Sequence, residues 1–288
     1  MMQAPMTQAL SRPPAAPAPG GASPVFSLEA VSVAIGGRTI LHPTTLDIPA
    51  GRVVGLLGQN GSGKSTLLKM LARQIQPSAG RVRFEGRPLE NLGNRDFARR
   101  VAYLPQYPPT GTGLLARELV ALGRYLWHGA LGRFSDEDAA KVEGAMALTD
   151  TAAFASQALD TLSGGERQRV WLAMLVAQDS VCFLLDEPIS ALDIAHQIEI
   201  LTLIRDLSRD RGIGVLMVLH EVNMAARFCD EILALRDGRL IVSETPDRFM
   251  TTDRLREVYD VEMTVLRDPD SGLPLSFPRS SALLSDNW

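Results

Sequence analysis

The sequence Gly58-Gln59-Asn60-Gly61-Ser62-Gly63-Lys64-Ser65 matches the pattern G-x-x-x-x-G-K-[ST]. In such a loop the backbone N–H groups surround the phosphates of a nucleotide, Lys64 reaches the β and γ phosphates, and the Ser65 hydroxyl holds Mg²⁺. The apolar run Val53–Leu57 before the loop predicts a buried strand, and Thr66–Leu71 after it predicts a helix. The strand and helix that a phosphate-binding loop requires are therefore expected on either side of it.

A second glycine-containing segment, Leu162-Ser163-Gly164-Gly165-Glu166, opens a helical pattern that continues to Ala177. Ser163 is a typical helix N-cap, and an anion fits at the start of a helix. The spacing of Ser163 and Glu166 also fits an ordinary capping box. A capping box alone does not require two adjacent glycines, so we expect an amphipathic helix whose first turn can bind phosphate.

Two acidic residues, Asp186 and Glu187, end the apolar run Val181–Leu185. A continuous apolar run is typical of an inner strand of a parallel sheet, which brings the residues after it to the carboxyl edge of the sheet. There Asp186 would hold Mg²⁺ through water, and Glu187 would orient or deprotonate the attacking water. An Asp-Glu pair is also common at an ordinary strand end, so its order after the first two segments carries the interpretation.

These three segments, in this order, resemble the ATP-binding cassette (ABC) ATPases, and the resemblance extends from about Phe26 to Leu266. The Walker A motif corresponds to Gly58–Ser65, the signature motif to Leu162–Glu166 and the Walker B motif to Phe183–Asp186. The resemblance implies an α/β fold with a P-loop NTPase (RecA-like) core, an antiparallel β subdomain and an inserted α-helical signature subdomain.

Three smaller motifs support this resemblance, although each is weak alone. Gln106 matches the loop that touches both Mg²⁺ and the membrane partner, Ser190–Asp193 matches the D-loop, and His220 matches the switch histidine near the γ phosphate. A solvated loop glutamine and a strand-end histidine bonded to backbone are the ordinary alternatives. We expect His42 and His196 to be structural or exposed.

The resemblance implies a role for each of these positions. The residues expected to contact ATP are Ile35, Gly58, Gln59, Asn60, Gly61, Ser62, Gly63, Lys64, Ser65, Thr66, Ser163, Gly164, Gly165, Glu166 and Asp193. Catalysis would rest on Lys64, Gln106, Glu187 and His220, and Mg²⁺ would be held by Ser65, Gln106 and Asp186. Two copies would close head to tail around two ATP molecules, so that the signature serine and glycines of one copy cap the γ phosphate held by Lys64 of the other.

The chain departs from the family pattern at two positions. An aromatic residue usually stacks on adenine near the end of the first strand, but only aliphatic residues are present there, among them Ile35. This absence predicts weak selectivity for adenine. Ile189 stands where the family usually has threonine, and we expect that change to be tolerated.

Length and composition fit one cassette of 288 residues, with 45% hydrophobic residues and a formal net charge of −4. The basic excess of a dedicated nucleic-acid binder is missing, so no nucleic-acid partner is expected. No apolar run approaches the roughly 20 residues that cross a bilayer. Two cysteines provide no disulfide framework and suit a reducing compartment, which predicts a cytoplasmic protein.

The predicted organisation has three parts. Residues 1–24 form an Ala/Pro-rich segment that we expect to be disordered and that lacks the features of a signal peptide. Residues 25–266 form the ATPase domain, with a helical subdomain at about 107–176, and the tail 267–288 is turn-rich. Asp237-Gly238 between two apolar segments predicts a hairpin.

An aromatic and basic segment, Arg124–Phe134, lies in the helical insert. For Tyr125 and Trp127, docking of a partner and packing in the subdomain core have equal weight. By family resemblance, this insert and Gln106 receive a cytoplasmic helix of a transmembrane permease.

The segments Arg124–Phe134, Ala177–Ser180 and Ala191–Gln197 resemble the import ATPases for iron-siderophores, above all the ferric hydroxamate type. This implies a peripheral subunit on the cytoplasmic face of a bacterial inner membrane, served by a periplasmic siderophore-binding protein. A vitamin B12 or haem importer is the alternative cargo assignment. Two other function classes are a soluble ABC ATPase that acts in DNA repair or translation and the ATPase of an exporter. The compact helical insert favours a transporter over a soluble ATPase.

Overall fold

The computed structural model describes residues 24–109, 111–128, 132–190 and 192–279. Almost all of the predicted disordered segment 1–24 lies outside these residues, as do three positions of the aromatic segment, the D-loop alanine and the last nine residues of the tail. Among the described residues, no helix combines the length and the apolar character that crossing a bilayer requires.

The centre of the fold is a six-stranded sheet in which five strands run parallel. The apolar runs predicted from the sequence become strands buried on both faces. Every residue is buried in three of the four inner strands, β3 (Val53–Leu57), β7 (Cys182–Leu185) and β8 (Gly214–Val218). In spatial order the strands are β10 (Arg239–Glu244), β9 (Glu231–Arg236), β3 (Val53–Leu57), β8 (Gly214–Val218), β7 (Cys182–Leu185) and β6 (Val101–Leu104).

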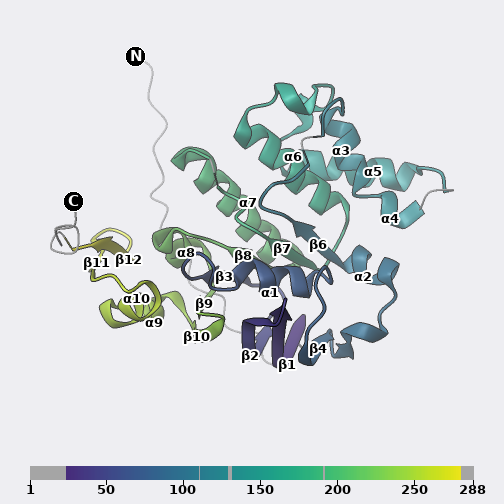
Figure 1. Cartoon of the computed structure of the whole chain (residues 1–288). Coiled ribbons are helices and arrows are strands. Elements are labelled where there is room, and N and C mark those ends of the chain that lie inside the picture. The colour runs from purple at the N-terminus through teal and green to yellow at the C-terminus, as the bar shows by residue number, and fades with distance from the viewer. Residues whose placement is uncertain (1–23, 110, 129–131, 191, 280–288) are drawn as a thin grey trace, which may run out of the picture.

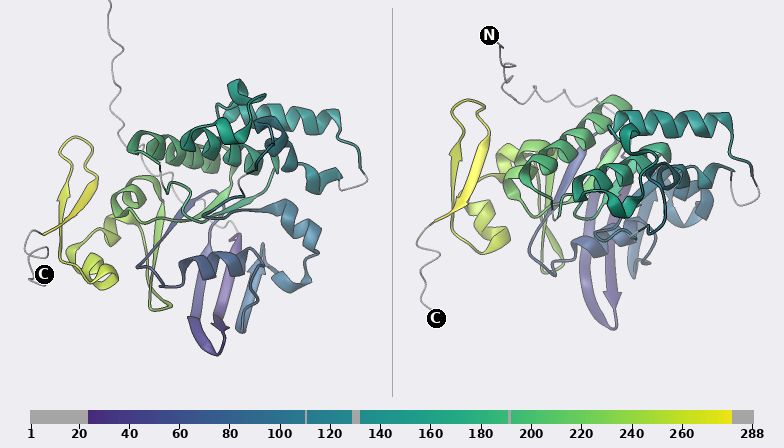
Figure 2. Two further views of the ribbon diagram at one scale, coloured as in Figure 1. Left: turned by 45° about the horizontal axis from the view of Figure 1, so that its top comes forward. Right: turned by 90° about the horizontal axis from the view of Figure 1, so that it is seen from above.

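A smaller antiparallel sheet lies on one side of this core (Figure 1). Helix α1 (Lys64–Leu71) buries Leu67 and Leu68 in the same hydrophobic cluster as residues of both sheets. The antiparallel strands extend away from the central sheet in both views of Figure 2. Their spatial order is β2 (Arg38–Ile48), β1 (Phe26–Ile35), β4 (Ala79–Phe84) and β5 (Arg87–Pro88).

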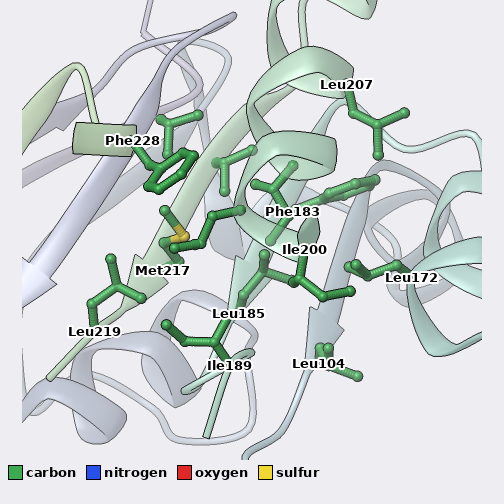
Figure 3. Packing of buried hydrophobic residues seen from close by; sticks show 14 of the residues in the cluster. Leu104, Leu172, Phe183, Leu185, Ile189, Ile200, Leu207, Met217, Leu219 and Phe228 are labelled. Atoms are coloured by element: carbon green, nitrogen blue, oxygen red, sulfur yellow. The ribbon is translucent and has the colours of Figure 1, made fainter. Parts of the chain in front are cut away.

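The opposite face of the central sheet is covered by helices (Figure 1). Figure 3 shows Phe183, Leu185 and Met217 of the sheet in one cluster with Leu172 of α6 (Gly164–Ala177) and Ile200 of α7 (Ile194–Arg211), all buried. The helices and short helical turns on this side are α3 (Ala116–Leu122), α4 (Tyr125–His128), α5 (Asp136–Leu148), η2 (Ala152–Phe154), η3 (Leu159–Thr161), α6 (Gly164–Ala177), α7 (Ile194–Arg211) and α8 (Val222–Phe228). The remaining ones are η1 (Leu89–Asn91), α2 (Asn94–Arg100), α9 (Pro246–Phe249) and α10 (Thr252–Tyr259).

Several local predictions can be compared with these elements. The hairpin β9–β10 is confirmed, and its two turn residues, Asp237 at φ 49° and Gly238 at φ 72°, adopt the left-handed conformation of a tight hairpin turn. Arg99 and Arg100 end α2, directly before β6. Helix α6 is amphipathic only at its start, because its second half is enclosed by α3, α5 and the sheet and is buried nearly all round.

The segment after Arg267 is more ordered than its turn-rich sequence suggests. Strands β11 (Met263–Arg267) and β12 (Pro274–Pro278) pair as a hairpin, so the expected boundary at residue 266 falls inside a strand. One face of the hairpin lies on α8, where Asn223 accepts from the Ser276 N–H at 2.8 Å and donates to the Ser276 carbonyl at 3.0 Å. This packing against α8, which the sequence pattern does not reveal, orders the strands.

Candidate functional site

The phosphate-binding loop lies between β3 and α1, as predicted. Gly58 has φ 140°, and a Cβ at this position would lie 2.1 Å from the Leu235 carbonyl oxygen, so only glycine fits. Gly63, at φ 99°, is the N-cap of α1 and directs the first N–H groups of the helix into the loop. Ser62 and Gly63 are buried, whereas Gln59, Asn60 and Gly61 are exposed, and Ser65 and Thr66 are half-buried.

Lys64 folds back over this loop. Its Nζ donates to the carbonyls of Gly58 at 2.8 Å and Gln59 at 2.9 Å. Burial lowers the pKa of Lys64, while the nearby carboxylates of Glu187 and Asp186 oppose that shift. The ammonium is thus held among the backbone groups that a phosphate chain would meet.

Asp186 and Ser65 provide oxygen ligands of the kind that Mg²⁺ prefers. The Ser65 hydroxyl donates to Asp186 Oδ1 at 3.1 Å, and Asp186 is buried directly after β7. Burial raises the pKa of Asp186, although the Ser65 hydrogen bond works against it. Among the described residues no cluster of three or more His, Cys, Asp and Glu side chains could hold a metal by itself. The residues therefore fit a Mg²⁺ that is completed by nucleotide oxygens and water.

Glu187 is held from both sides. Its Oε2 accepts from Gln106 Nε2 at 2.6 Å, and its Oε1 lies 2.6 Å from His220 Nε2. The backbone of Glu187 has φ 54°, a conformation that non-glycine residues rarely adopt and that is often found at functional sites. A cavity of about 150 Å³ lies beside this group and is also lined by Ser190 and Gln197. The structure thus joins Gln106, Glu187 and His220 by direct contacts, and Lys64 lies near enough to feel the charge of Glu187.

The signature segment begins α6, apart from the phosphate-binding loop of the same copy (Figure 1). Ser163 and Glu166 form the capping box: the Ser163 N–H donates to Glu166 Oε2 at 2.8 Å, and the Ser163 hydroxyl accepts from the Glu166 N–H at 3.3 Å. These hydrogen bonds lower the pKa of Glu166. Ser163 and Gly164 are exposed, so the start of the helix is open to a ligand from outside the chain.

The D-loop lies against this signature segment. Asp193 is the N-cap of α7, and its Oδ1 accepts from the His196 N–H at 3.0 Å. A Cβ at Gly165 would lie 2.4 Å from His196 Cδ2. His196, expected to be structural or exposed, is half-buried and packs on Gly165. The sequence did not identify its partner, because residues 165 and 196 are distant in the sequence.

The two departures from the family pattern have different surroundings. Ile35, at the end of β1, is 52% exposed and can contact a base only through an aliphatic surface. Ile189 is buried and packs with Leu185 and Leu219 in Figure 3. An apolar side chain therefore suits position 189.

Two further contacts were not predicted. The Gln59 amide donates to the Tyr259 carbonyl at 2.8 Å, which connects the phosphate-binding loop to the end of α10. Arg124 and Asp138 form a buried ion pair at 2.9 Å, and Arg124 also donates to the Ala177 carbonyl at 3.0 Å. Both link segments far apart in the sequence, and no local pattern identifies such pairs.

The Trp127 side chain contacts other parts of the chain, although it is 37% exposed. Its indole N–H donates to the Gln178 carbonyl at 2.8 Å, and its ring lies between the guanidinium groups of Arg99 and Arg124 at 4.9 and 4.8 Å. Tyr125 is 49% exposed, and Tyr107, next to Gln106, is 82% exposed.

Comparisons with known proteins agree with these observations. A family model described as ABC transporter matches residues 41–190. The chain is 39% identical to the iron(3+)-hydroxamate import ATP-binding protein FhuC of Bacillus subtilis, over 87% of this chain and 93% of that protein. It is 37% identical to the ferric enterobactin transport ATP-binding protein FepC of Escherichia coli, over 87% and 92%. It is 40% identical to the hemin import ATP-binding protein HmuV of Pseudomonas putida, over 88% and 100%.

Solved structures show the same fold. A putative metal-chelate type ABC transporter in an inward-facing conformation superposes with a TM-score of 0.79 at 23% identity, over 91% of this chain and 100% of that one. A dimeric bacterial ABC transporter cassette superposes with a TM-score of 0.66 at 27% identity, over 77% and 98%. The predicted α/β fold is confirmed.

Proposed function

The chain belongs to the ABC transporter family of ATP-binding subunits. From this premise we propose that it powers bacterial import of ferric siderophores, and that siderophores of the hydroxamate type are its favoured cargo. The similarity to FhuC over nearly the whole chain supports this cargo. Haem is a second candidate, because the similarity to hemin import subunits is equally high at 40%. The family hydrolyses ATP, and the cargo class is the part that needs its own test.

The observation that carries the proposed chemistry is Glu187 held between Gln106 and His220. With both carboxylate oxygens engaged, Glu187 is fixed where it can orient a water molecule and accept its proton during attack on the γ phosphate. His220 lies on the other side of the same carboxylate, and Lys64 supplies positive charge for the β and γ oxygens. Bound Mg²⁺, held by Ser65, Asp186 and Gln106, would add charge neutralisation.

The proposal includes a second copy of the chain. Ser163 and Gly164 are exposed at the start of α6, and Asp193 is exposed nearby at the start of α7. These groups lie apart from Lys64 of their own copy, so a partner copy is needed to bring them to the same ATP. ATP then acts as the ligand that favours the closed pair, and its hydrolysis reopens the pair. The dimeric cassette among the similar structures supports this arrangement.

The remaining partners follow from the same family. Two large side chains are exposed near Gln106 in the sequence: Tyr107, which follows it, and Leu122 of the helical subdomain. We assign this surface to a transmembrane permease, which would hold the chain at the cytoplasmic face of the inner membrane. A periplasmic siderophore-binding protein would act indirectly, on the other side of the permease. Nucleic acid has no place in this assignment.

Uptake of radio-iron ferrichrome tests the function. Cells that lack their native import ATPase would receive the wild-type chain, Lys64→Ala, or the control Lys141→Ala, which removes an exposed lysine paired with Asp179. We expect uptake with the wild type and the control but not with Lys64→Ala. Restored haem uptake without ferrichrome uptake would reassign the cargo to haem. If the wild-type chain restores neither uptake, the importer proposal is contradicted.

A further inference from the structure

The two signature glycines lie against two side chains of the same copy, Leu192 in the D-loop and His196 in the first turn of α7. A Cβ at Gly164 would lie 3.6 Å from Leu192 Cδ2, an ordinary contact. A Cβ at Gly165 would lie 2.4 Å from His196 Cδ2, 2.8 Å from Cγ and 3.0 Å from Nε2, a severe overlap. The His196 ring therefore occupies the space that a side chain at position 165 would need.

His196 also holds Asp193 by two contacts. The backbone N–H of His196 donates to Asp193 Oδ1 at 3.0 Å, and its ring Nδ1 lies 2.8 Å from Asp193 Oδ2. Both carboxylate oxygens are thus fixed by one residue, and these contacts lower the pKa of Asp193. At the start of α6, the hydrogen bonds from Ser163 and, after them, the charge of a protonated His196 lower the pKa of Glu166.

From this geometry we infer that His196 is a positioning residue, which makes the Asp193 carboxylate and the signature glycines one rigid surface. The inference rests on the proposed function, in which that surface meets the ATP held by a second copy. His196 itself is half-buried behind the signature helix and need not touch ATP. Its removal would leave the phosphate-binding loop of its own copy intact and would disorder the groups offered to the partner.

Three substitutions separate the two contacts of the side chain. His196→Asn retains an N–H donor near the position of Nδ1 and can still hold Asp193. His196→Phe retains a ring over Gly165 but loses the side-chain contact with Asp193, and His196→Ala loses both side-chain contacts. The backbone N–H of residue 196 can still donate to Asp193 in all three variants. Thr251→Ala is the control, because Thr251 is also a helix N-cap that accepts a backbone N–H, but it begins α10. This control shows whether loss of a helix N-cap contact elsewhere in the chain lowers ATP hydrolysis by itself.

The experiment measures ATP hydrolysis by the full-length protein at several ATP concentrations, together with binding of a fluorescent ATP analogue to the inactive background Glu187→Gln. We expect kcat to fall about tenfold or more in His196→Ala, which loses both side-chain contacts, and by a smaller factor in His196→Phe and His196→Asn, which each keep one of them. Thr251→Ala should stay within about threefold of wild type. Analogue binding measured at protein concentrations too low for pairing should change less than about twofold. Equal kcat in wild type and His196→Ala, or a loss in Thr251→Ala as large as that in His196→Ala, would overturn the inference.

Thermal unfolding gives an independent readout of the ring contact. Gly165→Ala should lower the unfolding temperature in the wild-type background by more than in the His196→Ala background, where the overlapping ring is gone. Equal losses in both backgrounds would show that the ring does not fill this space. Failure of the proposed function is recognised differently: the wild type would not hydrolyse ATP, or Lys64→Ala would hydrolyse it equally well.

Discussion

The buried pair Arg124–Asp138 in the helical subdomain allows a quantitative prediction for Asp138→Asn. Burial alone would favour the neutral acid, but hydrogen bonds from Ser135 and Arg124 and the charge of Arg124 outweigh it and lower the pKa of Asp138 from 3.8 to about 2. At roughly 1.4 kcal/mol per pKa unit, the charged form contributes about 2 kcal/mol to the free energy of unfolding. Asparagine has nearly the same shape without the charge, so Asp138→Asn should cost about that amount.

The pH dependence has a definite sign. Because the pKa of Asp138 is lower in the folded state, its contribution is fully present above the unfolded value of 3.8 and is lost as the pH falls through about 2. The difference between wild type and Asp138→Asn should therefore be constant from pH 7 to pH 5 and fall to roughly half at pH 3.

Urea unfolding followed by circular dichroism at pH 7, 5 and 3 measures this difference. For a domain of this size, the loss at pH 7 also corresponds to roughly 4 to 8 °C in the unfolding temperature. Asp136→Asn is the matched control, since Asp136 lies exposed in the first turn of the same helix and should change stability by less than about 1 kcal/mol. A loss below 1 kcal/mol for Asp138→Asn at pH 7, or an equal loss at pH 3, would refute this reasoning.

Three further predictions concern the site and the core. Glu187→Gln should reduce ATP hydrolysis by roughly 100-fold or more while ATP stays bound, as phosphate release and nucleotide retention would measure, because the amide cannot accept the proton of water. ATP and GTP should be hydrolysed at comparable rates, because the aliphatic surface of Ile35 does not select adenine. A strong preference for ATP in this comparison would contradict the prediction. Phe183→Ala should cost about 3 to 5 kcal/mol in denaturant unfolding, because Phe183 is fully buried among the side chains of Figure 3; a loss below about 1 kcal/mol would show that the core collapses into the space.

The central sheet and its phosphate-binding loop were predictable because their signals are local. A short, β-branched apolar run such as Val53–Leu57, followed directly by a glycine-rich loop, is typical of an inner strand, and the glycines next to it have conformations that few other residues accept. Ser163 as the N-cap of α6 is a local signal of the same kind. The order of these signals along the chain was enough to indicate the family.

What the sequence did not reveal depends on contacts between distant segments. The overlap between Gly165 and His196, and the hydrogen bond from Gln59 to Tyr259, join positions about 30 and 200 residues apart. The C-terminal hairpin escaped prediction for a similar reason, because prolines at both ends of β12 disfavour a strand until α8 pairs with its backbone.

The stacking of Trp127 has a spectroscopic consequence. The indole ring lies between Arg99, which belongs to α2 next to the central sheet, and Arg124, which belongs to the helical subdomain. Arg95 and Arg99 of α2 also donate to the carbonyls of Leu126 and Trp127. If the subdomain rotates relative to the sheet, α4 either breaks these bonds or moves with α2, and in both cases one of the two ring–guanidinium distances changes. Replacing Trp171 by phenylalanine and removing Trp288 would leave Trp127 as the sole tryptophan emitter. Its fluorescence would then report, without an attached dye, the movement of the helical subdomain as ATP binds.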